Sequence, residues 1–233
     1  YNVVLDILSD VSCRSREKIE GDLIPLIIGE LSNSQIIAFV NQKGGVGKTT
    51  STVNLAASIA AKGYKVLLVD IDPQGNATSG LGVNKRELKV SSYDVLVNSM
   101  LIEKVMIKTD FDNLWVLPSS MNLAGAELEL VDMKNRDSRI KNALAPLKEK
   151  YEFIVIDCPP SLNMLTINAM TTADTVLVPI QCEYYALEGL SQVLKTVGLV
   201  QKKMNPNLEI EGVVFTMYDS RTNLSLEVVE NVK

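Results

Sequence analysis

The chain has 233 residues, of which 46% are hydrophobic, so it can bury the core of one large domain without disulfides or metal ions. It contains no histidine and three widely separated cysteines, which excludes histidine-based catalysis, histidine-ligated metals and a cysteine metal cluster. Its net charge of −5 argues against a protein that binds nucleic acid through an overall basic surface, and no apolar run reaches the roughly 18 residues that a membrane-spanning helix needs.

Residues 1–34 differ in composition from the rest of the chain. They carry three basic and six acidic side chains, a net charge of −3. Apolar residues at positions 3, 4, 7, 8 and 11 have the spacing of a short amphipathic helix. Two interpretations stay open: a regulatory or DNA-binding extension, or an appended leader of uncertain order.

From residue 35 onward, short β-branched runs alternate with helical segments. This pattern is typical of a parallel sheet covered on both faces, so we predict a three-layer α/β domain over 35–233 with a mostly parallel, twisted sheet. The predicted strands are 36–40, 65–71, 114–117, 153–157, 175–179 and 212–217. The clearest predicted helices are 48–61, 136–150 and 186–204.

The last of these helices has a distinct apolar pattern. Its apolar residues recur in three- and four-residue steps, so we predict one buried stripe. The stripe consists of Leu187, Leu190, Leu194, Val197, Val200 and Met204. Three lysines of the same helix, Lys195, Lys202 and Lys203, are predicted to lie on its solvent-facing side.

The strongest motif, KGGVGKTT at residues 43–50, lies between the first predicted strand and the first predicted helix. Glycines let a backbone wrap phosphate groups, and converging N–H groups at a helix start attract the anion. Lys48 is therefore predicted to reach the β- and γ-phosphates, Thr49 to ligate Mg²⁺ and Thr50 to contact the α-phosphate. The predicted nucleotide-binding residues are Gly44, Gly45, Val46, Gly47, Lys48, Thr49 and Thr50.

The motif departs from a plain phosphate loop at its start. Alignment of GxxxxGK[ST] on residues 47–49 places Gln42 where the first glycine is expected, and Lys43 follows it. This arrangement is the deviant Walker A form, KGGxGKT.

Carboxylates lie at the C-terminal ends of two of the predicted strands, where ligands bind in open α/β sheets. Asp72 is predicted to orient a water molecule for attack on the γ-phosphate. Asp70 either assists near Mg²⁺ or caps the following turn. Asp157 ends the apolar strand 153–157 in a Walker B arrangement and is predicted to hold Mg²⁺ through water. The adjacent Cys158 is predicted to be a packed thiol.

Together these motifs resemble those of the ParA/MinD superfamily of deviant Walker ATPases. Three further stretches are similar to the chromosomal ParA/Soj type: GNATSGLG at 75–82, NLAGAE at 122–127 and QCEYYALEGL at 181–190. The resemblance begins near residue 35 and does not include residues 1–34. It implies a P-loop ATPase domain of the AAA/CbiA type over 35–233, with ATP and Mg²⁺ as cofactors, and a family domain that continues beyond residue 233.

The resemblance also implies a functional cycle. ATP binding closes a homodimer in which Lys43 contacts the partner's nucleotide, and the dimer binds double-stranded DNA without sequence preference. A ParB-like protein stimulates hydrolysis, which drives chromosome or plasmid partitioning in the cytoplasm, on the nucleoid. The implied catalytic residues are Lys43, Lys48 and Asp72. The implied DNA contacts are Arg221 first, then Lys195, Lys202 and Lys203, for which an ordinary solvated helix face is the alternative.

Three other interpretations are open. A MinD-like, membrane-associated cell-division ATPase needs a basic amphipathic helix at its C-terminus. A metabolic ATP-dependent synthetase needs further polar residues that converge on an acid or amine substrate. A redox ATPase like the nitrogenase reductase needs a bridging cluster, which the cysteine spacing does not support.

Overall fold

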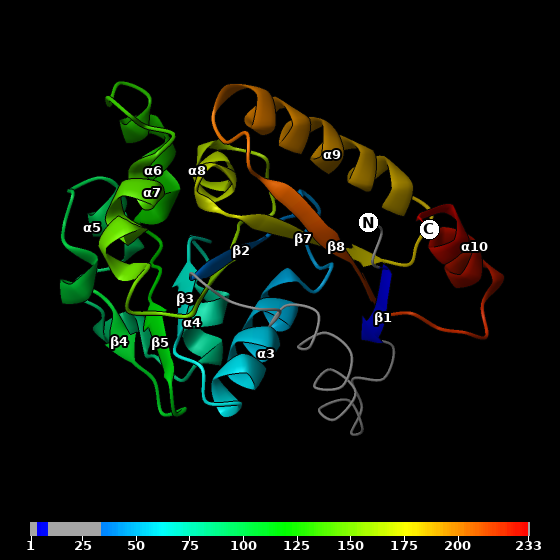
Figure 1. Ribbon diagram of the computed structural model, residues 1–233, viewed down its shortest axis with the longest axis horizontal. Coiled ribbons are helices and arrows are strands. Elements are labelled where there is room, and N and C mark those ends of the chain that lie inside the picture. The colour runs from blue at the N-terminus through cyan, green and yellow to red at the C-terminus, as the bar shows by residue number, and fades with distance from the viewer. Residues whose placement is uncertain (1–3, 9–33, 233) are drawn as a thin grey trace.

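The computed structural model describes the backbone of residues 4–8 and the chain from residue 34 to 232. A sheet of eight strands lies between two layers of helices (Figure 1). Its order is β1-β8-β7-β2-β6-β3-β5-β4, and every neighbouring pair is parallel except β4 with β5. The strands are β1 (Val4–Leu8), β2 (Gln35–Phe39), β3 (Val66–Asp70), β4 (Ile107–Lys108), β5 (Leu114–Leu117), β6 (Phe153–Asp157), β7 (Thr175–Gln181) and β8 (Glu209–Thr216).

The connections between strands supply the helices. They are α3 (Lys48–Ala61), α4 (Asn76–Gly80), α5 (Ser92–Leu96), α6 (Leu123–Leu130), α7 (Arg139–Leu144), α8 (Met164–Thr172), α9 (Ala186–Lys203) and α10 (Asn223–Val232). Short 3₁₀ turns occur at η1 (Lys85–Glu87), η2 (Ile102–Lys104) and η3 (Ala145–Leu147). None of the helices in the described part of the chain is long and apolar enough to cross a bilayer.

Alternate residues of the central strands point to opposite faces, so the sheet has a core on each side. Ile37 and Phe39 of β2 pack with Leu55 and Ile59 of α3, below the sheet in Figure 1. The other face, which includes Ile36, is covered by the helices from α5 onward, with α8 and α9 above the sheet. Because both faces are buried, the central strands are almost continuously apolar.

Parallel register brings the functional motifs to one edge. β6 lies between β2 and β3, and Asp157 at its end is in register with both Phe39 and Asp70. The loops that leave these three strands therefore start side by side. One of them is the predicted phosphate loop. The other two follow the strands that end in the carboxylates Asp70 and Asp157.

The predicted fold class is confirmed, and the six predicted strands are present with shifts of at most three residues at their ends. The predicted helix 136–150 is wrong in its extent. Helix α7 covers only Arg139–Leu144 and passes into the 3₁₀ turn η3. Pro146 lies inside that turn, and a proline there removes a helical hydrogen bond and clashes with the preceding turn.

The predicted stripe on α9 is only partly correct. The residues of α9 that are buried are Ala186, Val193, Val197 and Val200, and Leu190 packs against them. Met204, just beyond the last residue of α9, is exposed, and so are Leu187 and Leu194. The two leucines lie roughly 90° around the helix from the centre of the buried face, because successive residues turn by about 100°. Three- and four-residue steps can therefore follow apolar residues beyond the face that contacts the sheet.

The helical interpretation of the first residues is wrong for positions 4–8. These residues form β1, which extends the sheet in parallel alongside β8, with Val4 opposite Val213 and Leu8 opposite Thr216. The free edge of β8 offers unpaired N–H and C=O groups, which an extended apolar segment can satisfy. Positions 3 and 11, and the rest of the predicted extension up to residue 33, lie outside the described residues.

Candidate active site

A cavity of about 300 Å³ opens at the carboxyl edge of the sheet. It is formed by the loop between β2 and α3, the loop between β3 and α4, and single residues that follow β6 and β8. The residues that line it are Gly44, Gly45, Gly47, Lys48, Thr49, Thr50, Asp72, Gln74, Asn76, Pro160 and Met217. The predicted phosphate loop and the predicted water-orienting carboxylate therefore share one cavity.

The loop between β2 and α3 has the backbone of a phosphate cradle. Gly45 and Gly47 have φ angles of 76° and 81°, in the left-handed region that glycine adopts without strain. A Cβ on Gly47 would also lie only 3.2 Å from Cγ2 of Thr216 on β8. Helix α3 begins at the next residue, so its N-terminus faces the cavity. Val46 is buried and does not line the cavity; its carbonyl accepts a hydrogen bond from Thr216 Oγ1 at 2.9 Å.

Lys48 is the buried cation of the cavity, with 6% of its surface exposed. Its Nζ donates to the backbone oxygen of Lys43 at 2.8 Å. Burial lowers the pKa of Lys48, although the nearby carboxylates of Asp157 and Asp72 oppose this effect. The lysine therefore has a single carbonyl partner within the described residues and would gain from an anion in the cavity.

Asp157 provides a buried carboxylate with an unused oxygen. Its Oδ1 accepts from Thr52 Oγ1 at 3.1 Å, and its Oδ2 is buried without a hydrogen-bond partner in the described part of the chain. Burial, together with the neighbouring Asp70, raises the pKa of Asp157 to about 7, and the Thr49 and Thr52 hydroxyls act in the opposite direction. An unsatisfied carboxylate oxygen beside a threonine hydroxyl fits a hydrated Mg²⁺ ion.

Asp70 and Asp72 have different environments although they are two residues apart. Asp72 lines the cavity, and its Oδ1 accepts from the Gln74 backbone N–H at 2.9 Å. Asp70 is fully buried, and its Oδ2 accepts from the N–H and the hydroxyl of Thr78 at 2.8 and 2.6 Å. Its Oδ1 accepts from the Asp72 N–H at 3.1 Å. These contacts favour the turn-capping interpretation of Asp70, and burial raises its pKa to about 6.

Lys43 does not line the cavity, in contrast to Lys48. Its side chain forms an ion pair with Glu183, in the loop between β7 and α9. Its backbone N–H donates to Asn41 Oδ1 at 2.9 Å, and Asn41 Nδ2 donates to the Pro179 carbonyl of β7 at 2.7 Å. The lysine that marks the deviant motif is therefore directed toward the β7 side of the site.

Sequence reasoning missed three contributors to this site. Ser119, which follows β5, donates from Oγ to the Asp72 carbonyl at 2.6 Å, and its N–H donates to Thr78 Oγ1 at 2.9 Å. Met217 follows β8 and lines the cavity. Glu183 pairs with Lys43. For Ser119 and Met217, only their positions just beyond strand ends could have indicated a role, whereas Glu183 lies in the stretch 181–190 that resembles the ParA/Soj type.

The predicted DNA contacts lie along α9, which runs across the top of Figure 1, and just before α10, which lies at its right. Lys195, Lys202 and Lys203 are exposed along α9, as predicted. Arg221 precedes α10 and is exposed, but its guanidinium donates to both carboxylate oxygens of Asp219 at 2.9 and 2.8 Å. Part of its charge is therefore compensated within the chain.

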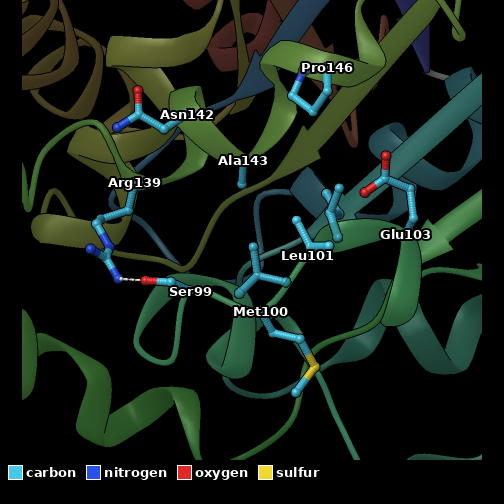
Figure 2. A pocket seen from close by; sticks show the side chains of 10 residues that line it. Ser99, Met100, Leu101, Glu103, Arg139, Asn142, Ala143 and Pro146 are labelled. Carbon is cyan, nitrogen blue, oxygen red and sulfur yellow. Dashed lines mark hydrogen bonds between the residues drawn. The ribbon is translucent and has the colours of Figure 1, made fainter.

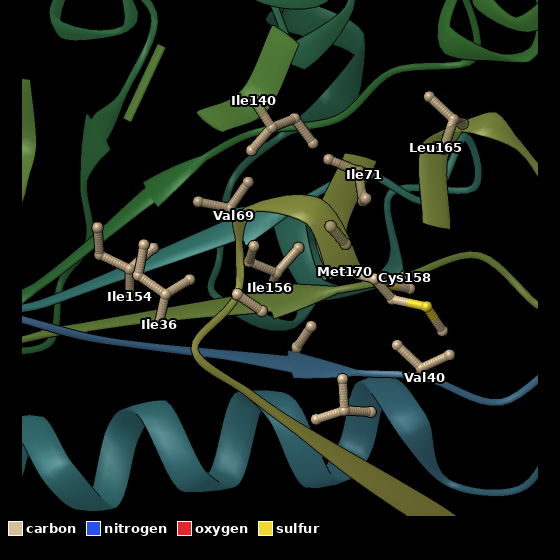
Figure 3. Packing of buried hydrophobic residues seen from close by; sticks show 14 of the residues in the cluster. Ile36, Val40, Val69, Ile71, Ile140, Ile154, Ile156, Cys158, Leu165 and Met170 are labelled. Atoms are coloured by element: carbon tan, nitrogen blue, oxygen red, sulfur yellow. The ribbon is translucent and has the colours of Figure 1, made fainter. Parts of the chain in front are cut away.

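Cys158 is a fully buried thiol. Figure 3 shows it among apolar side chains that include Val40 and Met170, and burial raises its pKa well above the usual value. In the described part of the chain, no group of histidine, cysteine and acidic residues could hold a metal ion by itself. The prediction of a packed thiol is confirmed.

A second cavity, of about 320 Å³, lies between η2 and α7 (Figure 2). Its charged side chains have structural partners. Arg139 donates to the Leu96 and Val97 carbonyls at the end of α5 and to Ser99 Oγ, at 2.7, 3.2 and 2.7 Å. Glu103 pairs with Lys150. The motif residues are gathered at the other cavity, which is therefore the candidate active site.

Comparisons with known proteins agree with this geometry. A family model described as an AAA domain matches residues 34–210. The sporulation initiation inhibitor protein Soj of Bacillus subtilis is 57% identical over 199 residues, which are 85% of this chain and 79% of that protein. The chromosome partitioning protein ParA of Myxococcus xanthus is 51% identical over 199 residues, 85% of this chain and 70% of that protein.

The chain belongs to the ParA/Soj family. The ParA/Soj fold is also found in a solved structure of cobyrinic acid a,c-diamide synthase from Mycobacterium smegmatis with bound ADP and magnesium. That protein is 42% identical, with a TM-score of 0.82, and the match covers 85% of this chain and 81% of that one. The ParA/Soj motifs thus lie in a fold that holds a nucleotide and magnesium in a related protein.

Proposed function

We propose that this chain is an ATP-dependent dimerising switch that partitions chromosomes or plasmids. It binds Mg²⁺–ATP, forms a homodimer, binds DNA without sequence preference and hydrolyses ATP when a ParB-like protein stimulates it, in the cytoplasm and on the nucleoid. The observation that carries the proposal is the cavity in which the deviant phosphate loop meets Asp72, together with the buried, unsatisfied oxygen of Asp157 at the end of the adjacent strand β6. The high identity to proteins named Soj and ParA supports the biological role.

Each residue of the cavity has a specific task in this proposal. Lys48 exchanges its carbonyl partner for phosphate oxygens, and the loop N–H groups bind the same anion. Thr49 and Asp157 would hold Mg²⁺, which would supply charge stabilisation at the phosphates. Asp72 orients water toward the γ-phosphate. Phosphoryl transfer depends mainly on positioning and electrostatics, so one oriented carboxylate is sufficient.

The direction of Lys43 supports dimerisation. Because this lysine does not line its own cavity, its charge is available to a nucleotide that lies outside its own subunit. The family resemblance assigns it the nucleotide of the partner subunit. DNA binding is assigned to the exposed α9 lysines and Arg221, because a chain of net charge −5 must concentrate its basic residues on one surface to bind DNA.

Asp72→Ala tests the switch directly. We expect this variant to dimerise with Mg²⁺–ATP, while hydrolysis falls by about 100-fold or more, because the water is no longer oriented. Light scattering after gel filtration gives the oligomeric state, and phosphate release gives the rate. Asp112→Ala, an exposed acid in the turn after β4, is the matched control. Hydrolysis by Asp72→Ala at the parental rate would rule out the role assigned to Asp72.

A second candidate function is an ATP-dependent synthetase, because a protein named as a diamide synthase, solved with bound ADP and magnesium, is 42% identical. A synthetase would turn over ATP only with a carboxylic acid and an amine donor, whereas the switch turns over ATP alone and faster with DNA and a ParB-like protein. A MinD-like membrane role would appear as ATP-dependent binding to lipid vesicles. A gel shift on random duplex DNA, with and without ATP, discriminates the switch from both.

A further inference from the structure

The Lys43–Glu183 ion pair joins two segments that are distant in the sequence. Lys43 lies in the phosphate loop, and Glu183 lies in the short loop between β7 and α9. Both side chains are partly exposed, at 41% and 29%, so the pair lies at the surface of the subunit near the mouth of the site. In the described part of the chain, Lys43 forms an ion pair with no other acid.

The surrounding contacts fix both ends of this pair. The Lys43 backbone is bound to β7 through Asn41, which donates to the Pro179 carbonyl at 2.7 Å. The Glu183 N–H donates to the Gln181 carbonyl at 2.8 Å, and the Glu183 carbonyl accepts from Ala186 at 3.0 Å. Glu183 is thus held in a tight turn that leads into the first residue of α9. The carboxylate is held where the lysine side chain meets it, outside the nucleotide cavity.

This arrangement makes two interactions mutually exclusive. Lys43 carries one charge at the end of a flexible stem, and it cannot lie against Glu183 and against a nucleotide on a second subunit at the same time. An isolated subunit keeps the lysine neutralised. A facing subunit that carries a triphosphate offers several negative charges, which compete for the lysine more strongly than one carboxylate does.

We propose that Glu183 is a latch that holds Lys43 inside its own subunit until a second, nucleotide-bound copy displaces it. This inference rests on the proposed function, because it concerns the regulation of the same dimerising site. The latch opposes premature dimerisation, and it attaches the phosphate loop to the turn that carries Tyr184 and Tyr185 into α9. These two tyrosines are exposed and contact each other edge to face, with ring centroids 5.2 Å apart.

Glu183→Gln tests the latch, because it removes the charge and keeps the size of the side chain. The experiment compares Asp72→Ala with Asp72→Ala/Glu183→Gln by sedimentation at saturating Mg²⁺–ATP. A partly exposed ion pair shifts an equilibrium by up to about fivefold, and a dimer opens two latches, so we expect dimerisation to tighten by about 2- to 20-fold. The gain shrinks in high salt, because salt screens exposed charges.

Glu188→Gln in the same background is the matched control, because Glu188 is an exposed acid in the first turn of α9. We expect it to leave dimerisation unchanged. Equal tightening by both variants would show a general charge effect and overturn the latch. Unchanged or weaker dimerisation of the Glu183→Gln variant would also overturn it. A monomeric Asp72→Ala parent at saturating Mg²⁺–ATP would overturn the proposed function itself, and the latch with it.

Discussion

Lys48 and Asp157 are two buried charged side chains that the described residues satisfy only in part. Lys48 has a carbonyl partner, and one oxygen of Asp157 has none. Buried charges without full partners reduce stability, so such groups are typical of sites that a ligand completes. The phosphate-loop motif predicted Lys48, and the Walker B arrangement at the end of strand 153–157 predicted Asp157. Neither pattern could predict the Lys48 contact to the Lys43 carbonyl.

Replacement of Lys48 tests its role in nucleotide binding and in ATP-dependent dimerisation. We expect Lys48→Ala to weaken ATP binding by roughly 10- to 100-fold, because charged hydrogen bonds to phosphate are lost, and to abolish ATP-dependent dimerisation. Calorimetry with ATP measures the first effect and gel filtration the second. Lys62→Ala, an exposed lysine at the end of the same helix, is the control. Nucleotide binding at parental strength would contradict the assignment.

Asp70 is expected to matter for stability. Asp70→Ala leaves the Thr78 and Asp72 N–H groups without their acceptor, which costs about 1–3 kcal/mol in the free energy of unfolding. Urea unfolding of the nucleotide-free protein measures this loss, with Asp112→Ala for comparison. A variant with parental stability but impaired Mg²⁺ binding would show that the carboxylate serves the metal instead.

At the scale of whole elements, α7 shows a contact that joins distant parts of the chain. The Ser138 side chain does not cap this helix. Asn168 of α8 accepts from the N–H groups of Arg139 and Ile140 at 2.9 and 3.3 Å, and it donates to the Arg136 and Met164 carbonyls. The helix therefore begins where a side chain from another helix satisfies its first N–H groups.

The Asn168 contacts should have a large effect on stability. Because Asn168 is fully buried, we expect Asn168→Ala to lower the free energy of unfolding by roughly 2 kcal/mol or more. Chemical denaturation measures the change, and Asn142→Ala, an exposed residue of α7, should stay near the parental value. If the two variants were equally stable, the cap from α8 would contribute little.

The sequence predicted those elements whose pattern depends on near neighbours. The central strands and α3 were predicted well, because continuous apolar runs and the glycine motif define them locally. The start of α7 depends on Asn168, the buried face of α9 depends on its angle to the sheet, and β1 depends on the free edge of β8. The Lys43–Glu183 pair likewise needs β2 and β7 to be neighbours. Contacts of this kind join residues that are far apart in the sequence. They can be predicted only when the order of the strands and helices in space is known, and local sequence patterns do not give that order.

For the whole molecule, the distribution of charge decides whether DNA can bind. The net charge is −5, so binding must come from a local surface and must weaken steeply as salt rises. The three exposed lysines of α9 are the described cations that best fit such a surface. Arg221 contributes less in this state, because Asp219 accepts two of its N–H groups.

Removal of all three α9 lysines tests this surface. We expect Lys195→Ala/Lys202→Ala/Lys203→Ala to weaken DNA binding of the ATP-bound form and to flatten its salt dependence by about 0.9 in log–log slope per lost phosphate contact. Fluorescence anisotropy on random duplex DNA measures both. The triple variant at Lys62, Lys104 and Lys148, exposed lysines on other elements, should keep the parental slope. An unchanged salt-dependence slope in the α9 variant would show that the DNA-binding surface lies elsewhere on the molecule.

The contact between Gly47 and Thr216 has a consequence for how this site can vary. Thr216 holds the Val46 carbonyl through its hydroxyl, while its methyl group lies where a side chain at position 47 would have to go. The two positions therefore form one steric unit, although one lies in the phosphate loop and the other on β8. A bulkier residue at 216 would displace the loop without touching the nucleotide, so tolerance to mutation should be low at a position that no nucleotide motif includes.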